Sequence, residues 1–287
     1  MSYIFYAWLT SFAYGVGSVV GKISTKHQIR NPWQYNFVWA MLTVISIVPF
    51  AIIGHVGWPH DWGSMLWLSL ANAVSGLLFI LAFFAVDLSV LSPLAMLRTP
   101  LLALCGALIF REHLSSIQWG LIGIVFLAGI FVNLDEKMSI KSILNKNILL
   151  AFAWILSSVW YNSMIKFASK TNGFWEVSLW PSLIAVVLFL PTIPLFYKDL
   201  LRTKPAQNIG IAMTTILYTI GLLFSIKAFG KNIGISIAII SLPLAMLMTM
   251  ALSKISPTLL EKHTGKVYVI RLIAAAVMFA AAVGLST

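Results

Sequence analysis

The chain has 287 residues, of which 60% are apolar and only 9% are charged, and its mean hydropathy is +0.94. A soluble domain carries about 25% charged residues, so this sequence lacks the polar surface of a water-soluble enzyme or a disordered chain. A disulfide scaffold is also excluded, because Cys105 is the only cysteine. The remaining class is an integral membrane protein that crosses the bilayer many times.

Ten apolar stretches follow one another along the chain, each long enough to cross a bilayer as a helix. They show no alternation of apolar and polar residues, so membrane-spanning strands are not expected. The gaps between them are too short for a soluble domain. The sequence predicts an all-α integral membrane protein with transmembrane helices near residues 3–22, 33–53, 65–86, 89–110, 117–134, 147–168, 175–197, 208–229, 233–253 and 267–285.

The two halves of the chain share short matches in the same order. Ser92–Leu97 recurs as Leu242–Leu247, and four further pairs accompany it: Ala7–Ser11 with Ala153–Ser157, Asn31–Trp39 with Asn172–Trp180, Leu77–Phe79 with Leu222–Phe224, and Phe110–His113 with Leu260–His263. Five ordered matches indicate an internal duplication. We therefore divide the single membrane domain into a first repeat, residues 1–138, and a second repeat, residues 139–287.

Each repeat holds five predicted helices, and because five is odd the two copies enter the membrane from opposite sides. Inverted-topology repeats are typical of secondary transporters, whose substrate sites lie near the bilayer midplane between the repeats. The alternative is a duplicated scaffold with only a structural role. The inverted duplication favours transport by alternating access.

The loop and helix ends of both halves carry a recognisable pattern. The first half has Pro100–Leu104, Phe110–Ser115, Gln118–Gly120, Gly123 and Ala128–Gly129, and the second half has a weaker copy in Pro243, Glu261–His263, Arg271 and Ala282–Gly284. With the five-plus-five helices, this pattern resembles the drug/metabolite transporter superfamily, EamA type. The resemblance implies a carrier of amino acids, nucleotide sugars, sugar phosphates, choline or drugs, working by exchange or an ion gradient.

Motifs for enzyme chemistry are missing from the sequence. There is no HExxH, GxSxG, CxxC or P-loop, and no pair of carboxylates at metal-binding spacing, so neither an enzyme activity nor a cofactor is expected. The glycine-rich segment Tyr14–Gly21 fits no phosphate-binding pattern. Its Gly17 and Gly21 instead predict a face of small residues where another helix approaches closely. Two alternatives stay open: a flippase of a lipid-linked substrate, and a membrane-embedded lipid-modifying enzyme.

The charged residues lie mainly at helix ends and in loops. All eight carboxylates do so, and we therefore expect no buried carboxylate and favour exchange or facilitated diffusion over proton coupling. Lys22 and Lys166 end predicted helices, where long side chains snorkel to the headgroups, and Lys227, Lys231 and Arg271 are interpreted in the same way. The net charge of +11 thus points to membrane lipids as partners and not to nucleic acid.

Several predicted helices carry polar residues at helical spacing. Facing lipid, these groups would lose hydrogen bonds to water at a cost of a few kcal/mol each, so they face other helices or a wet cavity. Hydrogen bonds between helices explain a single Ser or Thr equally well, whereas larger polar groups need more partners. The substrate-binding candidates from these helices are Tyr14, Asn36, Trp39, Asn72, Tyr161, Asn162 and Tyr218.

Arg98 is the first candidate for a substrate ligand. It lies near the middle of the predicted helix 89–110, where an arginine costs at least ~2.5–3.5 kcal/mol on insertion scales. Its repeat counterpart is Met248, so symmetric packing does not require the charge. A guanidinium facing a central cavity would hold a carboxylate or phosphate, which favours anionic or zwitterionic small-molecule substrates.

A second interpretation of Arg98 is purely structural. Pro93 and Pro100 each remove one backbone donor from the predicted helix, which would free the carbonyls of Ser89 and Met96. Arg98 would then donate to such carbonyls and only stabilise a kink.

The distribution of Lys and Arg predicts the orientation. Loops on the side of the termini hold five: Arg111, Lys166, Lys170, Lys227 and Lys231. Loops on the other side hold twelve, and the positive-inside rule places that side in the cytoplasm. We therefore expect a protein of the plasma (inner) membrane with both termini outside, although the family usually has cytoplasmic termini.

The orientation can be tested with a cysteine introduced at Thr287. We expect it to react with a membrane-impermeant thiol reagent in intact cells, because the terminus faces outward. The unsubstituted protein, with Cys105 inside an apolar run, provides the background signal. Labelling that occurs only after lysis would contradict this orientation.

Overall fold

The computed structural model describes residues 2–25, 31–85, 95–132, 146–202, 205–244, 247–248 and 265–286. All regular elements in these ranges are helical. In chain order they are α1 (Tyr3–Thr25), α2 (Pro32–Ile53), α3 (Trp62–Ala85), α5 (Arg98–Leu108), α6 (Ser116–Val132), α7 (Lys146–Ala168), α8 (Phe174–Phe189), the 3-10 helix η2 (Leu190–Leu195), α9 (Tyr197–Arg202), α10 (Pro205–Phe229), α11 (Ile233–Ile240) and α13 (Gly265–Ser286).

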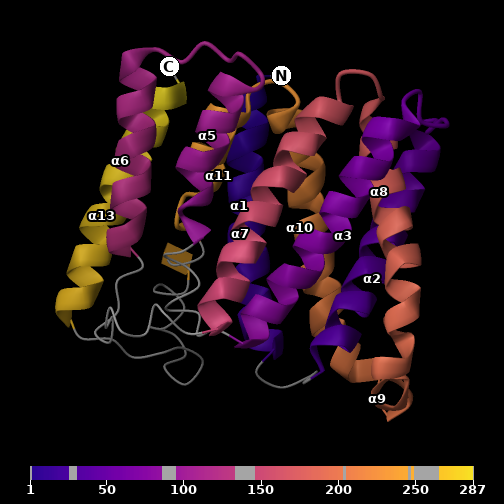
Figure 1. Ribbon diagram of the computed structural model, residues 1–287. Coiled ribbons are helices and arrows are strands. Elements are labelled where there is room, and N and C mark those ends of the chain that lie inside the picture. Colours follow the sequence, from indigo (N-terminus) through magenta and orange to yellow (C-terminus); the bar gives the residue numbers. More distant parts are fainter. Residues whose placement is uncertain are drawn as a thin grey trace.

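The long helices stand side by side as a bundle (Figure 1). Both chain termini lie at the same end of this bundle, which we call the terminal end. Among the described residues, six segments are long and apolar enough to cross a membrane, within α1, α2, α3, α8 with η2, α10 and α13. The all-helical class and the presence of membrane-spanning helices, predicted from the sequence, are therefore confirmed.

Three predicted helices differ from the observed elements. The predicted helix 175–197 tightens into η2 at Leu190, where Pro191 and Pro194 interrupt the α-helical hydrogen bonds. The predicted helix 233–253 ends at Ile240, because Pro243 has no N–H for the carbonyl of Ile239. That carbonyl instead accepts from the N–H of Leu242 at 3.2 Å. Of the predicted helix 89–110, the described part is helical only from α5 onward.

The start of α5 is arranged differently from the kink that the sequence predicts. Pro100 lies in the first turn of α5, where a backbone N–H has no partner within the helix anyway. The carbonyl of Met96 is not free, since it accepts from the N–H of Thr99 at 3.1 Å. The prediction for Met96 is therefore wrong, and Pro93 and Ser89 lie outside the described residues.

Helices from distant parts of the chain form the main packing pairs. α1 packs against α10, and α3 packs against α7. α2 packs against α8, α5 against α11, and α6 against α13. Each pair joins one helix from residues 1–138 with one from residues 139–287, so the interface between these two segments forms the centre of the bundle.

Glycines allow the close crossing of α1 and α10. A Cβ built on Gly17 would lie 2.8 Å from the ring of Tyr218, and one on Gly221 would lie 2.5 Å from the ring of Tyr14. Gly21 similarly meets Thr214. The predicted small-residue face of α1 thus packs against α10. The ring of Tyr218 packs on Gly17, and the ring of Tyr14 packs on Gly221.

A buried ion pair ties three segments together near the terminal end. The ammonium of Lys166 in α7 contacts the carboxylate of Glu112, and both side chains are less than a tenth exposed. The same carboxylate accepts from the backbone N–H groups of Ile233 and Gly234 at 2.8 and 3.1 Å, at the start of α11. The expectations that no carboxylate is buried and that Lys166 snorkels are therefore wrong, because these groups satisfy one another.

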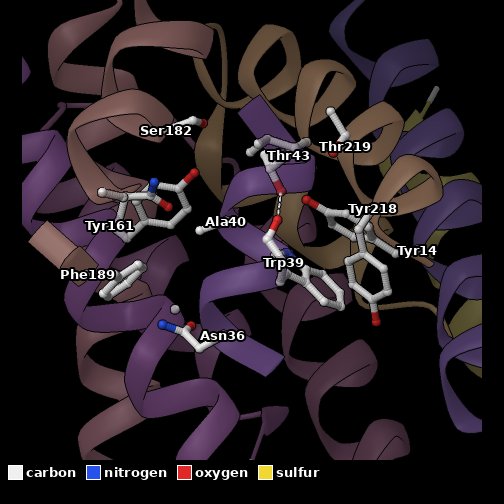
Figure 2. Close-up of a pocket in the computed structure, with 14 residues that line it drawn as sticks. Tyr14, Asn36, Trp39, Ala40, Thr43, Tyr161, Ser182, Phe189, Tyr218 and Thr219 are labelled. Carbon is white, nitrogen blue, oxygen red and sulfur yellow. Dashed lines mark hydrogen bonds between the residues drawn. The ribbon is translucent and has the colours of Figure 1, made fainter. Parts of the chain in front are cut away.

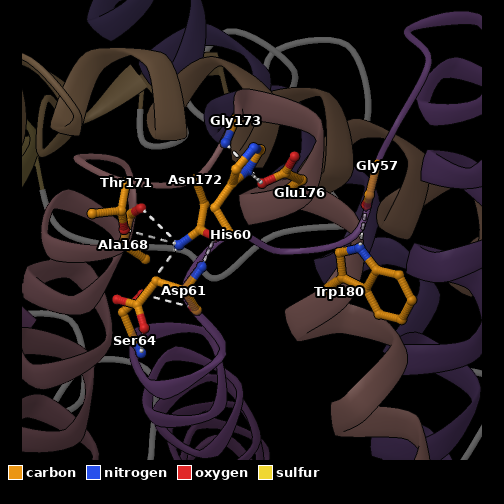
Figure 3. Close-up of polar contacts among 10 residues, drawn as sticks. All are labelled: Gly57, His60, Asp61, Ser64, Ala168, Thr171, Asn172, Gly173, Glu176 and Trp180. Atoms are coloured by element: carbon orange, nitrogen blue, oxygen red, sulfur yellow. Dashed lines mark hydrogen bonds and ion pairs between the residues drawn. The ribbon is translucent and has the colours of Figure 1, made fainter.

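A second polar network joins the start of α3 to the loop before α8 (Figure 3). The side chain of Asn172 accepts from the backbone N–H of Asp61 at 3.0 Å and donates to Ser64 Oγ at 3.1 Å. Asp61 caps α3 by accepting from the N–H of Ser64. Hydrogen bonding from Ser64 lowers the pKa of Asp61, so this capping carboxyl is ionised near neutral pH.

A related contact lies at the other end of the bundle. Asn31 caps α2 by accepting from the N–H of Trp33 at 3.0 Å. Its side-chain amide donates to the carboxylate of Asp199 in α9 at 2.7 Å. The loop before α2 is thereby attached to the segment before α10.

Gly221→Ala is expected to destabilise the bundle. The added methyl group would overlap the ring of Tyr14, and overpacking of this kind costs about 1–3 kcal/mol. The matched control is Gly120→Ala in α6, where no atom lies within 4 Å of the new Cβ. Thermal unfolding in detergent should show a lower midpoint for Gly221→Ala only, and equal shifts for both variants would contradict the proposed packing.

Lys166→Met tests the buried ion pair. Removing one partner leaves the buried carboxylate of Glu112 without its cation, which costs about 3 kcal/mol at the lower end of the usual range. Adding Glu112→Gln removes the uncompensated charge and should recover part of the lost thermal stability. Lys170→Met, one turn further on at an exposed position, serves as the control. Loss of stability that Glu112→Gln fails to reduce would contradict this account.

Candidate functional site

Polar and aromatic side chains inside the bundle line a cavity of about 440 Å³. This volume falls within the roughly 300–1,000 Å³ that is typical of small-molecule sites. All eight substrate-binding residues predicted from the sequence line it, from α1, α2, α3, α5, α7 and α10: Tyr14, Asn36, Trp39, Asn72, Arg98, Tyr161, Asn162 and Tyr218. The structure thus brings the candidates together, and their binding of a substrate stays a prediction.

A smaller recess of about 170 Å³ adjoins this cavity (Figure 2). The two spaces share seven lining residues, among them Asn36, Trp39 and Tyr161. Thr43, Ser182 and Thr219 line the recess alone, together with four apolar residues. Arg98 lines only the larger cavity, so the one charged side chain in the described lining is kept away from the recess.

Arg98 is positioned by the first turn of α5. Its Nε donates to the carbonyl of Ala95 at 3.2 Å, and its guanidinium carbon lies 5.1 Å from the centre of the Trp154 ring. The next residue, Thr99, is fully buried and hydrogen-bonds Ser241 at the end of α11, at 3.0 Å. These contacts hold the arginine beside the cavity.

The structure bears on the structural interpretation of Arg98, whereas its role as a substrate ligand stays a prediction. The side chain does bind a carbonyl, but that carbonyl belongs to Ala95 and not to Met96. Nε supplies one of the five guanidinium N–H donors, and no described carboxylate forms an ion pair with Arg98. Within the described ranges its other donors have no hydrogen-bond acceptor, and they lie beside the cavity.

Three aromatic side chains from α1, α2 and α10 form one wall of the cavity. The rings of Tyr14 and Tyr218 lie 5.1 Å apart, and Trp39 meets Tyr218 edge-on at the same distance. The hydroxyl of Tyr218 lies 2.8 Å from Ser18 Oγ. Figure 2 shows this group at one side of the recess and Tyr161 with Phe189 at the other.

The three asparagines of the cavity differ in their hydrogen bonds. Asn72 donates to the carbonyl of Pro181 in α8 at 3.3 Å, and Asn162 donates to the carbonyl of Ser158 at 2.7 Å. Asn72 thus forms the hydrogen bond between helices that the alternative role requires, whereas Asn162 bonds its own helix. Asn36 is only 5% exposed, yet its carboxamide has no hydrogen-bond partner in the described part of the chain.

The eight candidates leave out several lining residues, among them Trp154, which shares a polar helix face with Tyr161 and Asn162. Trp154 stands out because its ring carries the guanidinium of Arg98. It lies seven residues before Tyr161, two helical turns away on the same face of α7, and this spacing was the available signal. Thr43, Ser182 and Thr219 could not be distinguished from hydroxyls that merely bond their own helix.

No cluster of three His, Cys, Asp or Glu side chains suited to a metal occurs within the ranges that the structure describes. The available chemistry of the cavity is hydrogen bonding, aromatic contact and one positive charge.

Comparison with known proteins shows a shared fold. No model of a protein family and no curated protein matches the sequence. Among solved structures, one described only as a crystal structure of a protein superposes with a TM-score of 0.75. The match covers 100% of this chain and 96% of that chain at 12% sequence identity. Two sequences this different share a backbone arrangement, and nothing about their ligands follows.

Proposed function

We propose that this protein is a membrane carrier of the drug/metabolite transporter type that moves a small polar or amphipathic metabolite by alternating access. The observation that carries the proposal is the central cavity, lined from both halves of the chain and holding Arg98 as its one described charged residue. In our proposal ten transmembrane helices form two inverted five-helix repeats around this cavity.

The packing pairs support the repeat architecture. If the halves are equivalent, α1 corresponds to α7, and α3 corresponds to α10. Exchanging the halves turns the α1–α10 pair into the α3–α7 pair, and these are both observed. The pairs of α2 with α8, α5 with α11 and α6 with α13 are unchanged by the exchange. This is the pattern expected of a pseudo-twofold axis between two repeats.

The polar contacts at the helix starts support inversion. Asn31 and Asn172 occupy matching positions in the sequence repeat. Asn172 bonds Asp61 before α3, and Asn31 bonds Asp199 before α10, its counterpart helix. The two contacts lie at opposite ends of the bundle, as an axis within the membrane plane requires.

The proposed substrate carries a carboxylate or a phosphate. A guanidinium with free donors can bind two oxygens of a carboxylate or a phosphate at once, through its planar fork of N–H groups. Arg98 has no carboxylate partner among the described residues, so none of them supplies the ion pair that a purely structural charge would have. The anionic group of the substrate supplies this compensation while it is bound.

Alternating access requires that contacts between the halves at each end form and break in turn. In this conformation Glu112 of the first half binds Lys166 and the start of α11 in the second half. We infer that these contacts belong to the state in which the terminal end is closed. Separation of the halves at that end would have to break them.

Uptake by the purified protein in proteoliposomes tests the proposal. The panel comprises radiolabelled amino acids, phosphorylated metabolites, nucleotide sugars and quaternary amines, with empty liposomes as the control. We expect saturable uptake or exchange of at least one anionic or zwitterionic compound. Absence of transport across the panel, together with turnover of a lipid substrate by the solubilised protein, would contradict the carrier proposal.

Arg98→Met should reduce uptake at least tenfold, because it removes the guanidinium that binds the anionic group. Methionine is chosen because Met248 is the counterpart of Arg98 in the second repeat. Arg98→Lys should also reduce uptake, since it keeps the charge but loses the bidentate geometry. Lys198→Met removes a positive charge from an exposed position in α9 and should transport at the unsubstituted rate. Transport by Arg98→Met at that rate would exclude Arg98 as a substrate ligand.

A further inference from the structure

We propose that Asn36 determines specificity, binding an uncharged hydrogen-bonding group of the substrate while Arg98 holds the anionic group. The substrate class is then an organic anion with a carboxamide, hydroxyl or similar neutral polar group, and without an ammonium at that position. This inference rests on the proposed carrier function and adds the chemical identity of the second end of the substrate.

The unpaired carboxamide of Asn36 is the first observation. Its side chain lines both the cavity and the recess, and the residue is only 5% exposed. The amide of Asn36 has no hydrogen-bond partner among the described residues and is not among their fully buried polar atoms, so it stays open to a group that enters the cavity. Asn72 and Asn162 differ from it, because they donate to backbone carbonyls.

The surroundings of Asn36 leave room for a ligand. Asn36 lines both the cavity and the recess, and a methyl group built on Gly76 of α3 would come into van der Waals contact with its side-chain oxygen at 4.0 Å, so the glycine keeps this side of Asn36 open. A carboxamide offers one acceptor and two donors, so it can bind a hydroxyl or another amide at two points. Asn36 therefore has both the capacity and the space for a polar group of the substrate.

The charges around the cavity exclude an ammonium from this position. Neither the cavity nor the recess has a carboxylate in its described lining, and an ammonium there would be taken from water without a counter-ion. An aromatic ring face could replace the counter-ion. However, several lining rings already have partners: Arg98 lies over Trp154, Tyr14 packs on Tyr218, and Trp39 meets Tyr218 edge-on.

Two matched series of probes test the proposal by thermal stabilisation of the detergent-solubilised protein. The carboxylate series is glutaramate, pentanoate and 5-aminopentanoate, which end in a carboxamide, a methyl group and an ammonium. The phosphate series is 3-hydroxypropyl phosphate, propyl phosphate and 3-aminopropyl phosphate, which end in a hydroxyl, a methyl group and an ammonium. Comparing the two series shows whether the anionic group is a carboxylate or a phosphate.

The probe with the neutral polar end should stabilise the unsubstituted protein at about tenfold lower concentration than its apolar and ammonium partners. Asn36→Leu, a replacement of similar size, should abolish that advantage while leaving the affinity for the apolar probe unchanged. Asn36→Asp should reverse the preference toward the ammonium probe. Lys198→Met should behave like the unsubstituted protein, and Arg98→Met should weaken all probes together.

Equal or tighter binding of the apolar or ammonium probe, or an advantage that survives Asn36→Leu, would overturn the role of Asn36. Absence of stabilisation by all six probes would overturn it as well. Saturable uptake in the proteoliposome panel would uphold the carrier function in either case, so the two proposals can fail separately.

Discussion

The close approach of α1 and α10 is the constraint on which the centre of the structure depends. Gly17 and Gly221 each leave space for a tyrosine of the opposite helix, and the two rings then meet at 5.1 Å. Small residues permit such contacts in a bilayer, where burial of apolar surface supplies no driving force between helices. Because Tyr14 and Tyr218 also line the cavity, the helix crossing and the site are set by the same four residues.

Satisfaction of polar groups explains where the charges lie. Glu112 and Lys166 can be buried because their opposite charges compensate each other. Backbone N–H groups at the start of α11 also donate hydrogen bonds to the Glu112 carboxylate. Arg98 and Asn36 differ from them, since the described residues leave part of their hydrogen-bonding capacity unused. In a medium of low polarity, a polar group without hydrogen bonds raises the free energy of the protein. A ligand that supplies the missing hydrogen bonds removes this penalty and therefore binds more tightly. Glu112 and Lys166 thus stabilise the bundle, whereas Arg98 and Asn36 are the groups that we propose bind a ligand in the cavity.

The candidate site was largely accessible to sequence reasoning because a membrane restricts where polar side chains can face. Tyr161 and Asn162, for example, could be assigned to the bundle interior from their place in an apolar helix. The spacing did not reveal whether Asn72 and Asn162 bind a ligand or hydrogen-bond to helix backbone. The donor bond from Asn72 to Pro181 joins residues 109 positions apart, and only the folded chain brings these groups together.

The sequence by itself determined the all-helical membrane class, most helix positions and the small-residue face of α1, because these follow from local hydropathy and residue size. The tertiary structure decided the rest. It paired Glu112 with Lys166 and with an α11 start more than a hundred residues away, which no local pattern records. It also placed Arg98 over Trp154 and gave Asn36 no hydrogen-bond partner among the residues that the structure describes. These features depend on which helix faces meet, and that choice is made by packing across the two halves of the chain.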